Sequence, residues 1–247
     1  MERAVRKPSV VTPERFASGM TFAQYLAFVG SAANLAREGS GLTFRSGVVA
    51  RRDFNSHFRD WYAANPLSEA QAAAWRWLSS QPGGPAKILV ISEDWSSDCR
   101  RDVPMLARLA EAGNQELRIF TRDGQRFSRS RQPTLAEAPD SNADIMAEFL
   151  NVKNGQTWQS IPVAAFFTRD LEYLYHYVEY PAIYHKDRIR GHLLAARLGE
   201  TAAEADERGA RDFMALQQSP FFRVWASAGL DEIISVLHER LVVGSLA

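Results

Sequence analysis

This sequence has a single cysteine and no excess of charge of either sign. A single cysteine, Cys99, stands among 247 residues, which excludes an intramolecular disulfide and gives no sign of an oxidising compartment. The 29 lysine and arginine residues are balanced by 29 aspartate and glutamate residues. Because binding to phosphate backbones relies on excess positive charge, this balance argues against nucleic acid as the main partner.

Signatures of cofactors and metals are missing as well. The sequence contains neither a G-x-G-x-x-G fingerprint nor a P-loop. Cys99 is accompanied by no second cysteine and by no histidine at ligand spacing. We therefore expect no bound cofactor and no metal site.

The N-terminal region has no long hydrophobic run. Residues 19–36 carry no charge, but Gln24, Ser31 and Asn34 would interrupt a membrane-spanning segment. The apolar residues of this stretch fall at helical spacing, with Thr21 and Gln24 placed as a capping box. We expect an amphipathic helix here, no contact with a membrane, and a cytoplasmic protein.

Helical patterns dominate the sequence before Gly84. The expected helices cover residues 22–37, 53–64 and 68–80. A buried strand over 87–92, a helical stripe over 103–110 and a strand over 116–121 follow. A strand, a helix and a strand in this order predict a βαβ unit with parallel strands.

Beyond this unit the pattern changes again. Residues 123–142 are polar and are typical of an irregular insertion, and a helix is expected over 144–152. Apolar runs over 160–167 and 171–180, joined by a short polar turn, predict an antiparallel hairpin. The last expected helices cover 187–197, 202–217 and 230–241.

The most informative segment lies where the strand over 87–92 meets the following helix. Its sequence is Glu93-Asp94-Trp95-Ser96-Ser97-Asp98-Cys99, with Pro104 five residues further on. A tryptophan, a four-residue turn ending in cysteine and a proline one helical turn later resemble the thioredoxin superfamily, whose usual motif is W-C-x-x-C. Ile161-Pro162 stands before a strand and a hairpin, where that family has its cis-proline loop. The chain is also similar to bacterial thioredoxin-like proteins that carry an E-D-W-x-x-D motif.

The resemblance extends from residue 87 to about residue 197 and implies an α/β protein with a thioredoxin-like fold, in which helices flank a central mixed sheet. We expect this core at residues 85–200, an N-terminal helical extension at 1–84 and C-terminal helices at 201–247, all in one structural domain. The apolar faces of the extensions are expected to pack on the core or to form a homodimer interface.

The motif departs from the family at the residue on which redox chemistry depends. In the family, the first cysteine attacks a substrate disulfide from a helix start, and the second cysteine resolves the mixed disulfide. Here Ser96 stands at the attacking position and Cys99 at the resolving position. A hydroxyl cannot form a mixed disulfide, so we do not expect dithiol exchange by this chain alone. A disulfide between two copies stays open.

Three functions remain open at this point, and with them the question of whether the chain is an enzyme. The first is binding of a peptide or small ligand of unknown identity in the groove of the motif, without redox chemistry. The second is a redox enzyme that acts through a single thiol. The third is an acid/base or anion-binding site that uses no thiol.

The candidate residues form three groups. The binding groove would be lined by Trp95, Ser96, Ser97, Asp98, Ile161 and Pro162. The catalytic candidates are Cys99 and Ser96, although the simpler expectation is a buried Cys99 and a Ser96 that caps the helix. Acid/base or anion contacts would come from Glu93, Asp94, Arg100 and Arg101. Arginines 122, 126, 129 and 131 of the insertion are expected in a solvated loop, with an anion site as the alternative.

Overall fold

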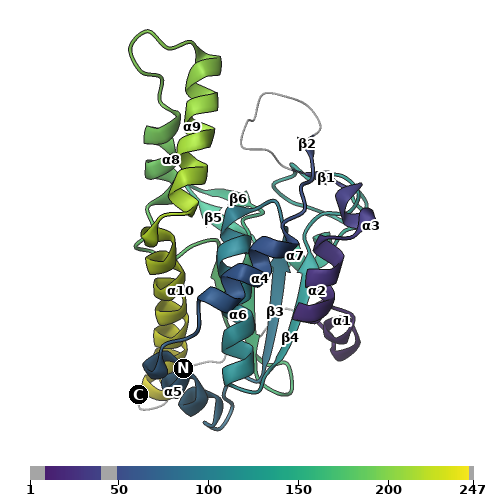
Figure 1. Ribbon diagram of the computed structural model, residues 1–247. Helices are drawn as coiled ribbons and strands as arrows, with labels where there is room; N and C mark the ends of the chain where they lie inside the picture. The colour runs from purple at the N-terminus through teal and green to yellow at the C-terminus, as the bar shows by residue number, and fades with distance from the viewer. Residues whose placement is uncertain (1–8, 40–48, 245–247) are drawn as a thin grey trace.

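The computed structural model (Figure 1) describes residues 9–39 and 49–244. Its centre is a four-stranded sheet in the order β4-β3-β7-β8. β3 is parallel to β4 and antiparallel to β7, and β7 is antiparallel to β8. The four strands are β3 (Lys87–Ser92), β4 (Glu116–Thr121), β7 (Val163–Phe167) and β8 (Tyr173–Val178). This mixed sheet confirms the predicted α/β architecture.

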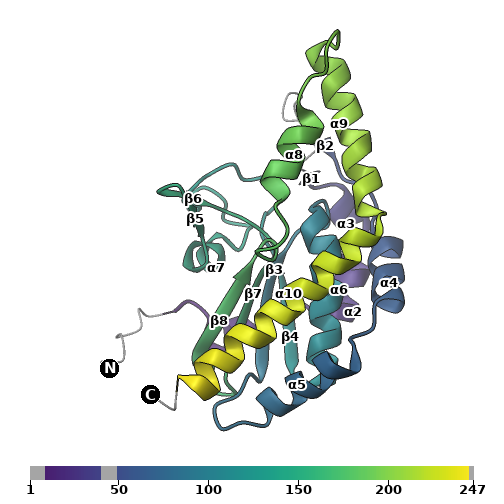
Figure 2. The same ribbon diagram turned by 90° about the vertical axis from the view of Figure 1, so that its left-hand side faces the viewer.

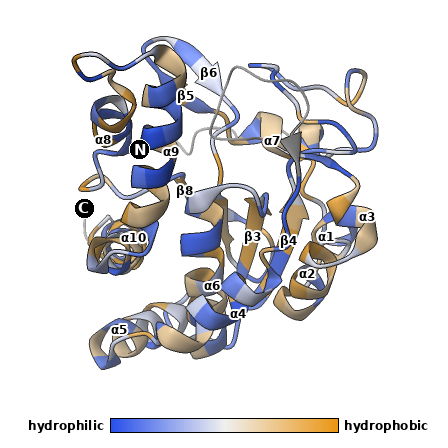
Figure 3. Ribbon diagram, turned by 45° about the horizontal axis from the view of Figure 1, so that its top comes forward, coloured by the Kyte–Doolittle hydropathy of each residue, from blue (hydrophilic) through white to orange (hydrophobic). Residues whose placement is uncertain are grey.

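Helix α6 (Ser97–Ala112) follows β3 closely and packs on β3 and β4. Because helices cover it and strands lie on both of its edges, β3 is buried from Ile88 to Ser92, which explains its unbroken apolar sequence. Figure 3 shows β3 and β4 in hydrophobic colours. Three helices from distant parts of the chain pack against α6, namely α4 (Asn55–Ala64), α5 (Glu69–Ser79) and α10 (Pro220–His238).

The helix predicted over 22–37 is divided in two, which corrects that prediction. α2 (Phe22–Val29) begins at the predicted capping box. Ser31 then caps a separate helix, α3 (Ala32–Leu35), by accepting a hydrogen bond from the N–H of Asn34 at 3.2 Å. A serine side chain that bonds to the backbone in this way competes with a continuous helix.

The other N-terminal elements are short. They are α1 (Pro13–Ala17) and the antiparallel pair β1 (Glu38–Gly39) and β2 (Val49–Ala50). A single bridge joins Met20 to Ile119 and so ties this region to the outer edge of β4.

Residues 122–142 contain no helix and no strand, as predicted for the insertion. The helix expected over 144–152 is α7 (Ala143–Glu148), and its predicted end is wrong. The chain instead forms a small hairpin of β5 (Asn151–Lys153) and β6 (Gln156–Trp158), which projects away from the main sheet (Figure 2).

The predicted hairpin after Pro162 is confirmed by the pairing of β7 with β8. After β8 in the sequence, α8 (Lys186–Leu194) and α9 (Ala202–Gln217) pack on each other and extend beyond the sheet (Figure 1). α10 starts at Pro220, ten residues earlier than expected, and continues into a π-helical segment, η1 (Glu239–Val243).

Candidate functional site

The motif occupies the junction between β3 and α6. Ser96 has the extended backbone of an N-cap residue (φ −77°, ψ 126°), and its Oγ accepts a hydrogen bond from the N–H of Cys99 at 3.4 Å. The structural role expected of Ser96 is therefore present. No described histidine forms a hydrogen bond with Ser96, so a catalytic serine has no general base at this position.

Strand pairing brings the proline segment to the same place. Ile91 of β3 pairs with Val163 of β7 in antiparallel register, so Ile161-Pro162 lies opposite the end of β3, where the motif begins. The peptide bond between Ile161 and Pro162 is cis.

The six residues predicted to line the groove are not equally accessible. Four of them are buried: Ser96, Asp98, Ile161 and Pro162. Trp95 and Ser97 are half-buried, as is the neighbouring Ser160. A ligand that approaches this end of α6 therefore meets Trp95, Ser97 and Ser160 first.

Cys99 points inward and is fully buried. Burial raises the pKa of its thiol to about 12, and the N–H of Glu93 donates to its Sγ at 3.5 Å. The thiolate is the nucleophilic form of cysteine, so little of the reactive species exists at neutral pH. This geometry fits the expected small buried hydrophobe and argues against the single-thiol enzyme.

Glu93 and Asp94 hold separate parts of the chain together. Arg37 donates to Glu93 Oε1 at 2.8 Å, and Arg51 pairs with both carboxylates, at 2.8 Å from Glu93 Oε2. Asn34 donates to Asp94 Oδ2 at 3.0 Å. Both acids lie just beyond the end of β3 at Ser92, so the alternation of side chains along a strand does not apply to them.

These carboxylates are deeply buried, with Glu93 1% and Asp94 2% exposed. Burial raises the pKa of Asp94, while Arg51 beside it acts in the opposite direction. The N–H of Asp123 also donates to Glu93 Oε1 at 2.8 Å. Glu93 thus joins Arg37, Arg51 and the insertion, and Asp94 joins α3 and Arg51. These structural roles argue against proton transfer to a ligand.

Asp98 lies in a second buried set of charges. It accepts from Arg101 Nη1 at 2.9 Å and pairs with Lys186, a residue 88 positions away. Arg101 is fully buried and also donates to both carboxylate oxygens of Asp102, at 2.7 Å each. Both acids belong to α6 itself, and Arg101 joins α6 to the chain after β8 by donating to the backbone oxygen of Glu179 at 3.2 Å. The anion contact expected of Arg101 stays a prediction.

Arg100 is 4% exposed and has no carboxylate partner among the described ion pairs. Its guanidinium donates to the backbone oxygens of Asp94 and Trp95 at 2.9 and 2.8 Å, and it lies 4.0 Å from the ring centre of Phe54. Burial lowers its pKa to about 10. With Gln217 as a further acceptor at 2.8 Å, Arg100 is held at the start of α6, and the anion contact expected of it stays a prediction.

Trp95 joins the motif to the insertion. Its ring is 5.5 Å from that of Phe127 in an edge contact, and the guanidinium of Arg122 lies 5.1 Å from the indole. Arg122 is held by two 3.0 Å hydrogen bonds to Asp123 and donates to the backbone oxygen of Gln159 at 3.1 Å. The insertion is thus packed on the motif through Phe127 and Arg122, a contact that neither the solvated loop nor the anion site predicted for it included.

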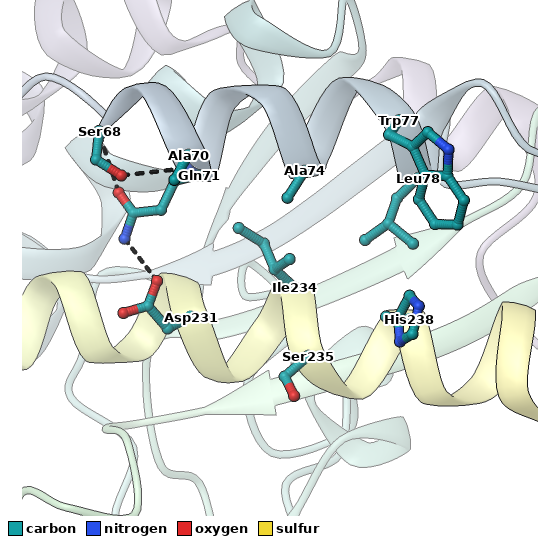
Figure 4. A pocket seen from close by; sticks show the side chains of 10 residues that line it. All are labelled: Ser68, Ala70, Gln71, Ala74, Trp77, Leu78, Asp231, Ile234, Ser235 and His238. Carbon is teal, nitrogen blue, oxygen red and sulfur yellow. Dashed lines mark hydrogen bonds between the residues drawn. The ribbon is translucent and has the colours of Figure 1, made fainter.

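A separate hollow of about 390 Å³ lies between α5 and α10 (Figure 4). Its lining is mostly apolar, with Ala74 and Ile234 at its middle and the rings of Trp77 and His238 5.9 Å apart at one end. α5 leads into the beginning of β3, whereas the motif follows the end of β3. The hollow therefore does not belong to the motif.

The described residues, 9–39 and 49–244, hold neither a membrane-spanning helix nor a metal-binding cluster. Within these ranges no helix is long and apolar enough to cross a membrane. The same residues contain no group of three or more His, Cys, Asp or Glu side chains that could hold a metal ion.

Residues 41–139 match a family model described as thioredoxin. This match includes the motif and β3, α6 and β4 around it. The chain is thioredoxin-like. The family model thus supports the resemblance drawn from Trp95 to Cys99, and this thioredoxin-like protein differs from the family's usual motif at Ser96.

Two solved structures are similar to this thioredoxin-like protein. One is a protein of unknown function from Pseudomonas aeruginosa, with 15% identity, a TM-score of 0.47, and coverage of 98% of this chain and 100% of that chain. The other is an HIV epitope-scaffold, with 16% identity, a TM-score of 0.47, and coverage of 94% and 98%. No curated protein matches the chain. Similarities this low carry nothing about function.

Proposed function

We propose that this thioredoxin-like protein does not exchange disulfides on its own and instead binds a peptide segment beside Trp95, Ser97 and the Ile161-Pro162 bond. The observation that carries the proposal is the pairing of a serine at the attacking position with a fully buried Cys99. Attack on a disulfide needs a thiolate. Ser96 has no sulfur, and the pKa of Cys99 is raised to about 12.

Peptide binding is supported by the backbone next to the proline. No described residue forms a hydrogen bond with the N–H or the C=O of Ile161. An extended partner could pair with these backbone groups by strand addition once it uncovers Ile161, which is 4% exposed. The half-buried Trp95 and Ser97 stand at the same end of the sheet and would contact the side chains of that partner. A cytoplasmic location and a homodimer remain predictions from the sequence.

The redox half of the proposal is tested by reduction of insulin with dithiothreitol as the electron source. Wild type is expected to add nothing to the rate with dithiothreitol alone. Ser96→Cys restores a sulfur at the helix start, three residues before Cys99, and is expected to gain measurable turnover. Turnover by wild type at the rate of a dithiol thioredoxin would overturn the proposal.

The binding half is tested by selecting peptides from a phage-displayed library on wild type. Selected peptides are expected to lose most of their affinity for Trp95→Ala, because the indole forms the rim of the site. Trp77→Ala serves as the matched control, since Trp77 is 47% exposed and lies on α5 beside the separate hollow. Equal binding to wild type and Trp95→Ala would place the peptides elsewhere and defeat this half.

A further inference from the structure

The insertion presents three exposed arginines close to the motif, namely Arg126, Arg129 and Arg131. None of them takes part in an ion pair with a described residue, whereas Arg122 of the same loop is buried and bonded to Asp123. Because the whole chain has equal numbers of positive and negative side chains, this cluster is a local feature and not part of a general surplus.

Aromatic rings support two of these arginines. The guanidinium of Arg131 lies 4.7 Å from the ring centre of Trp158, and that of Arg129 lies 5.9 Å from the ring centre of Phe127. A guanidinium that stacks on a ring keeps its N–H donors directed outward in its own plane, where they match a carboxylate. The rings thus limit the freedom of these arginines while their donors stay exposed.

The arginine loop is fastened to the segment that leads into the cis-proline. Gln159 Nε2 donates to Ser128 Oγ at 2.9 Å and to the backbone oxygen of Ser130 at 2.7 Å. Thr157 Oγ1 donates to the backbone oxygen of Arg131 at 2.7 Å. Phe127 completes the connection, since its ring touches Trp95. The loop that carries the exposed arginines is therefore bonded to residues before the cis-proline and contacts Trp95 through Phe127.

We propose that Arg126, Arg129 and Arg131 form a docking surface for an acidic peptide segment. This inference rests on the proposed function and adds the chemical class of the partner: an extended chain with carboxylates beyond the part that lies at Trp95. Charge-assisted hydrogen bonds from arginine to carboxylate supply the specificity.

Single-stranded nucleic acid is the competing partner for a surface of arginines and aromatic rings. Bases stack on ring faces, and a guanidinium already lies over Trp158 and over Phe127, which leaves less ring surface for stacking. The neutral charge of the whole chain also provides no wider field for phosphates. The observations therefore favour the acidic peptide.

The test measures binding of fluorescein-labelled octaglutamate by anisotropy, with octaglutamine, octalysine and a twelve-residue oligothymidine as comparison probes. The full-length variant R126Q/R129Q/R131Q is compared with R76Q/R211Q/R223Q, which changes three exposed arginines on α5, α9 and α10. Octaglutamate is expected to bind wild type and the control alike, and R126Q/R129Q/R131Q at least about tenfold more weakly. Added salt is expected to weaken binding to wild type.

Equal octaglutamate binding by the two triple variants, or none by wild type, would overturn the inference. Tighter binding of the oligothymidine than of octaglutamate would overturn it in favour of nucleic acid. The two proposals fail in different ways. If octaglutamate binding needs the arginines but is unchanged in Trp95→Ala, the docking surface is supported and the peptide site at the motif is contradicted. If the selected library peptides need Trp95 but carry no acidic residues, the peptide site at the motif is supported and the docking surface is contradicted.

Discussion

Two sets of arginines near the motif differ in their exposure and in their ion pairs. Arg37, Arg51 and Arg101 have side chains at most 5% exposed, and each is paired with carboxylates. The arginines at 126, 129 and 131 are exposed and form no ion pair with a described residue. A buried charge without its partner is strongly destabilising, so the first set must hold the protein together. Only the second set is available to a partner.

The largest expected effect comes from removing a buried arginine. Arg101→Ala leaves Asp98 and Asp102 buried with less compensation, and we expect the free energy of unfolding to fall by about 3–5 kcal/mol. Urea denaturation measures this loss. Arg129→Ala, which removes an exposed arginine, is expected to change it by less than about 0.5 kcal/mol. Similar losses of unfolding free energy in Arg101→Ala and Arg129→Ala would show that the buried and the exposed arginines contribute equally to stability.

A smaller effect is expected from the carboxylate that pairs with the other two buried arginines. Glu93→Gln keeps the shape of the side chain but weakens its bonds to Arg37 and Arg51, so we expect a loss of about 2–3 kcal/mol. Glu137→Gln, at an exposed position of the insertion, is the control. A Glu93→Gln variant as stable as wild type in urea would show that the buried pairs contribute little.

The smallest expected effect concerns pH. Burial lowers the pKa of His57, and the charge of Arg100 lowers it further. The unfolded chain therefore binds a proton at His57 more readily than the folded protein, and stability is lost as pH falls through about 6.5. One titrating group can give a slope of at most about 1.4 kcal/mol per pH unit, and the half-buried His57 is expected to give less than this.

The difference in unfolding free energy between wild type and His57→Asn, followed from pH 8 to pH 5, isolates this contribution from the acids that titrate nearby. A parallel pH dependence in both proteins would show that His57 is solvated. It would also show that the pKa of His57 is not affected by burial or by the charge of Arg100.

Local signals in the sequence were sufficient for most of the fold. The apolar run of β3 and the caps at Thr21 and Ser68 each depend on neighbours along the chain. The hairpin of β5 and β6 was missed although its signal is present. Asn154 and Gly155 have φ values of 53° and 72°, as a two-residue turn requires, and this pair is a strong hairpin signal.

The pairing of the candidate site could not be predicted in the same way. Glu93 meets Arg37 across 56 residues, and Asp98 meets Lys186 across 88 residues. Helical and strand periodicity describe neighbours within a few positions, so they contain no signal for such partners. Acids and arginines that the sequence offered as ligand contacts are therefore engaged inside the protein. The burial of Cys99, in contrast, followed from its place in the first turn of α6.

Thiol labelling measures the accessibility of that cysteine most directly. The rate at which Ellman's reagent modifies Cys99 is compared in native and in urea-unfolded protein at the same pH, which cancels the ionisation of a free thiol. We predict that the native protein reacts at least about a thousandfold more slowly, because modification must wait for the protein to open. A native rate within about tenfold of the unfolded rate would show an accessible sulfur at the motif and would contradict the account.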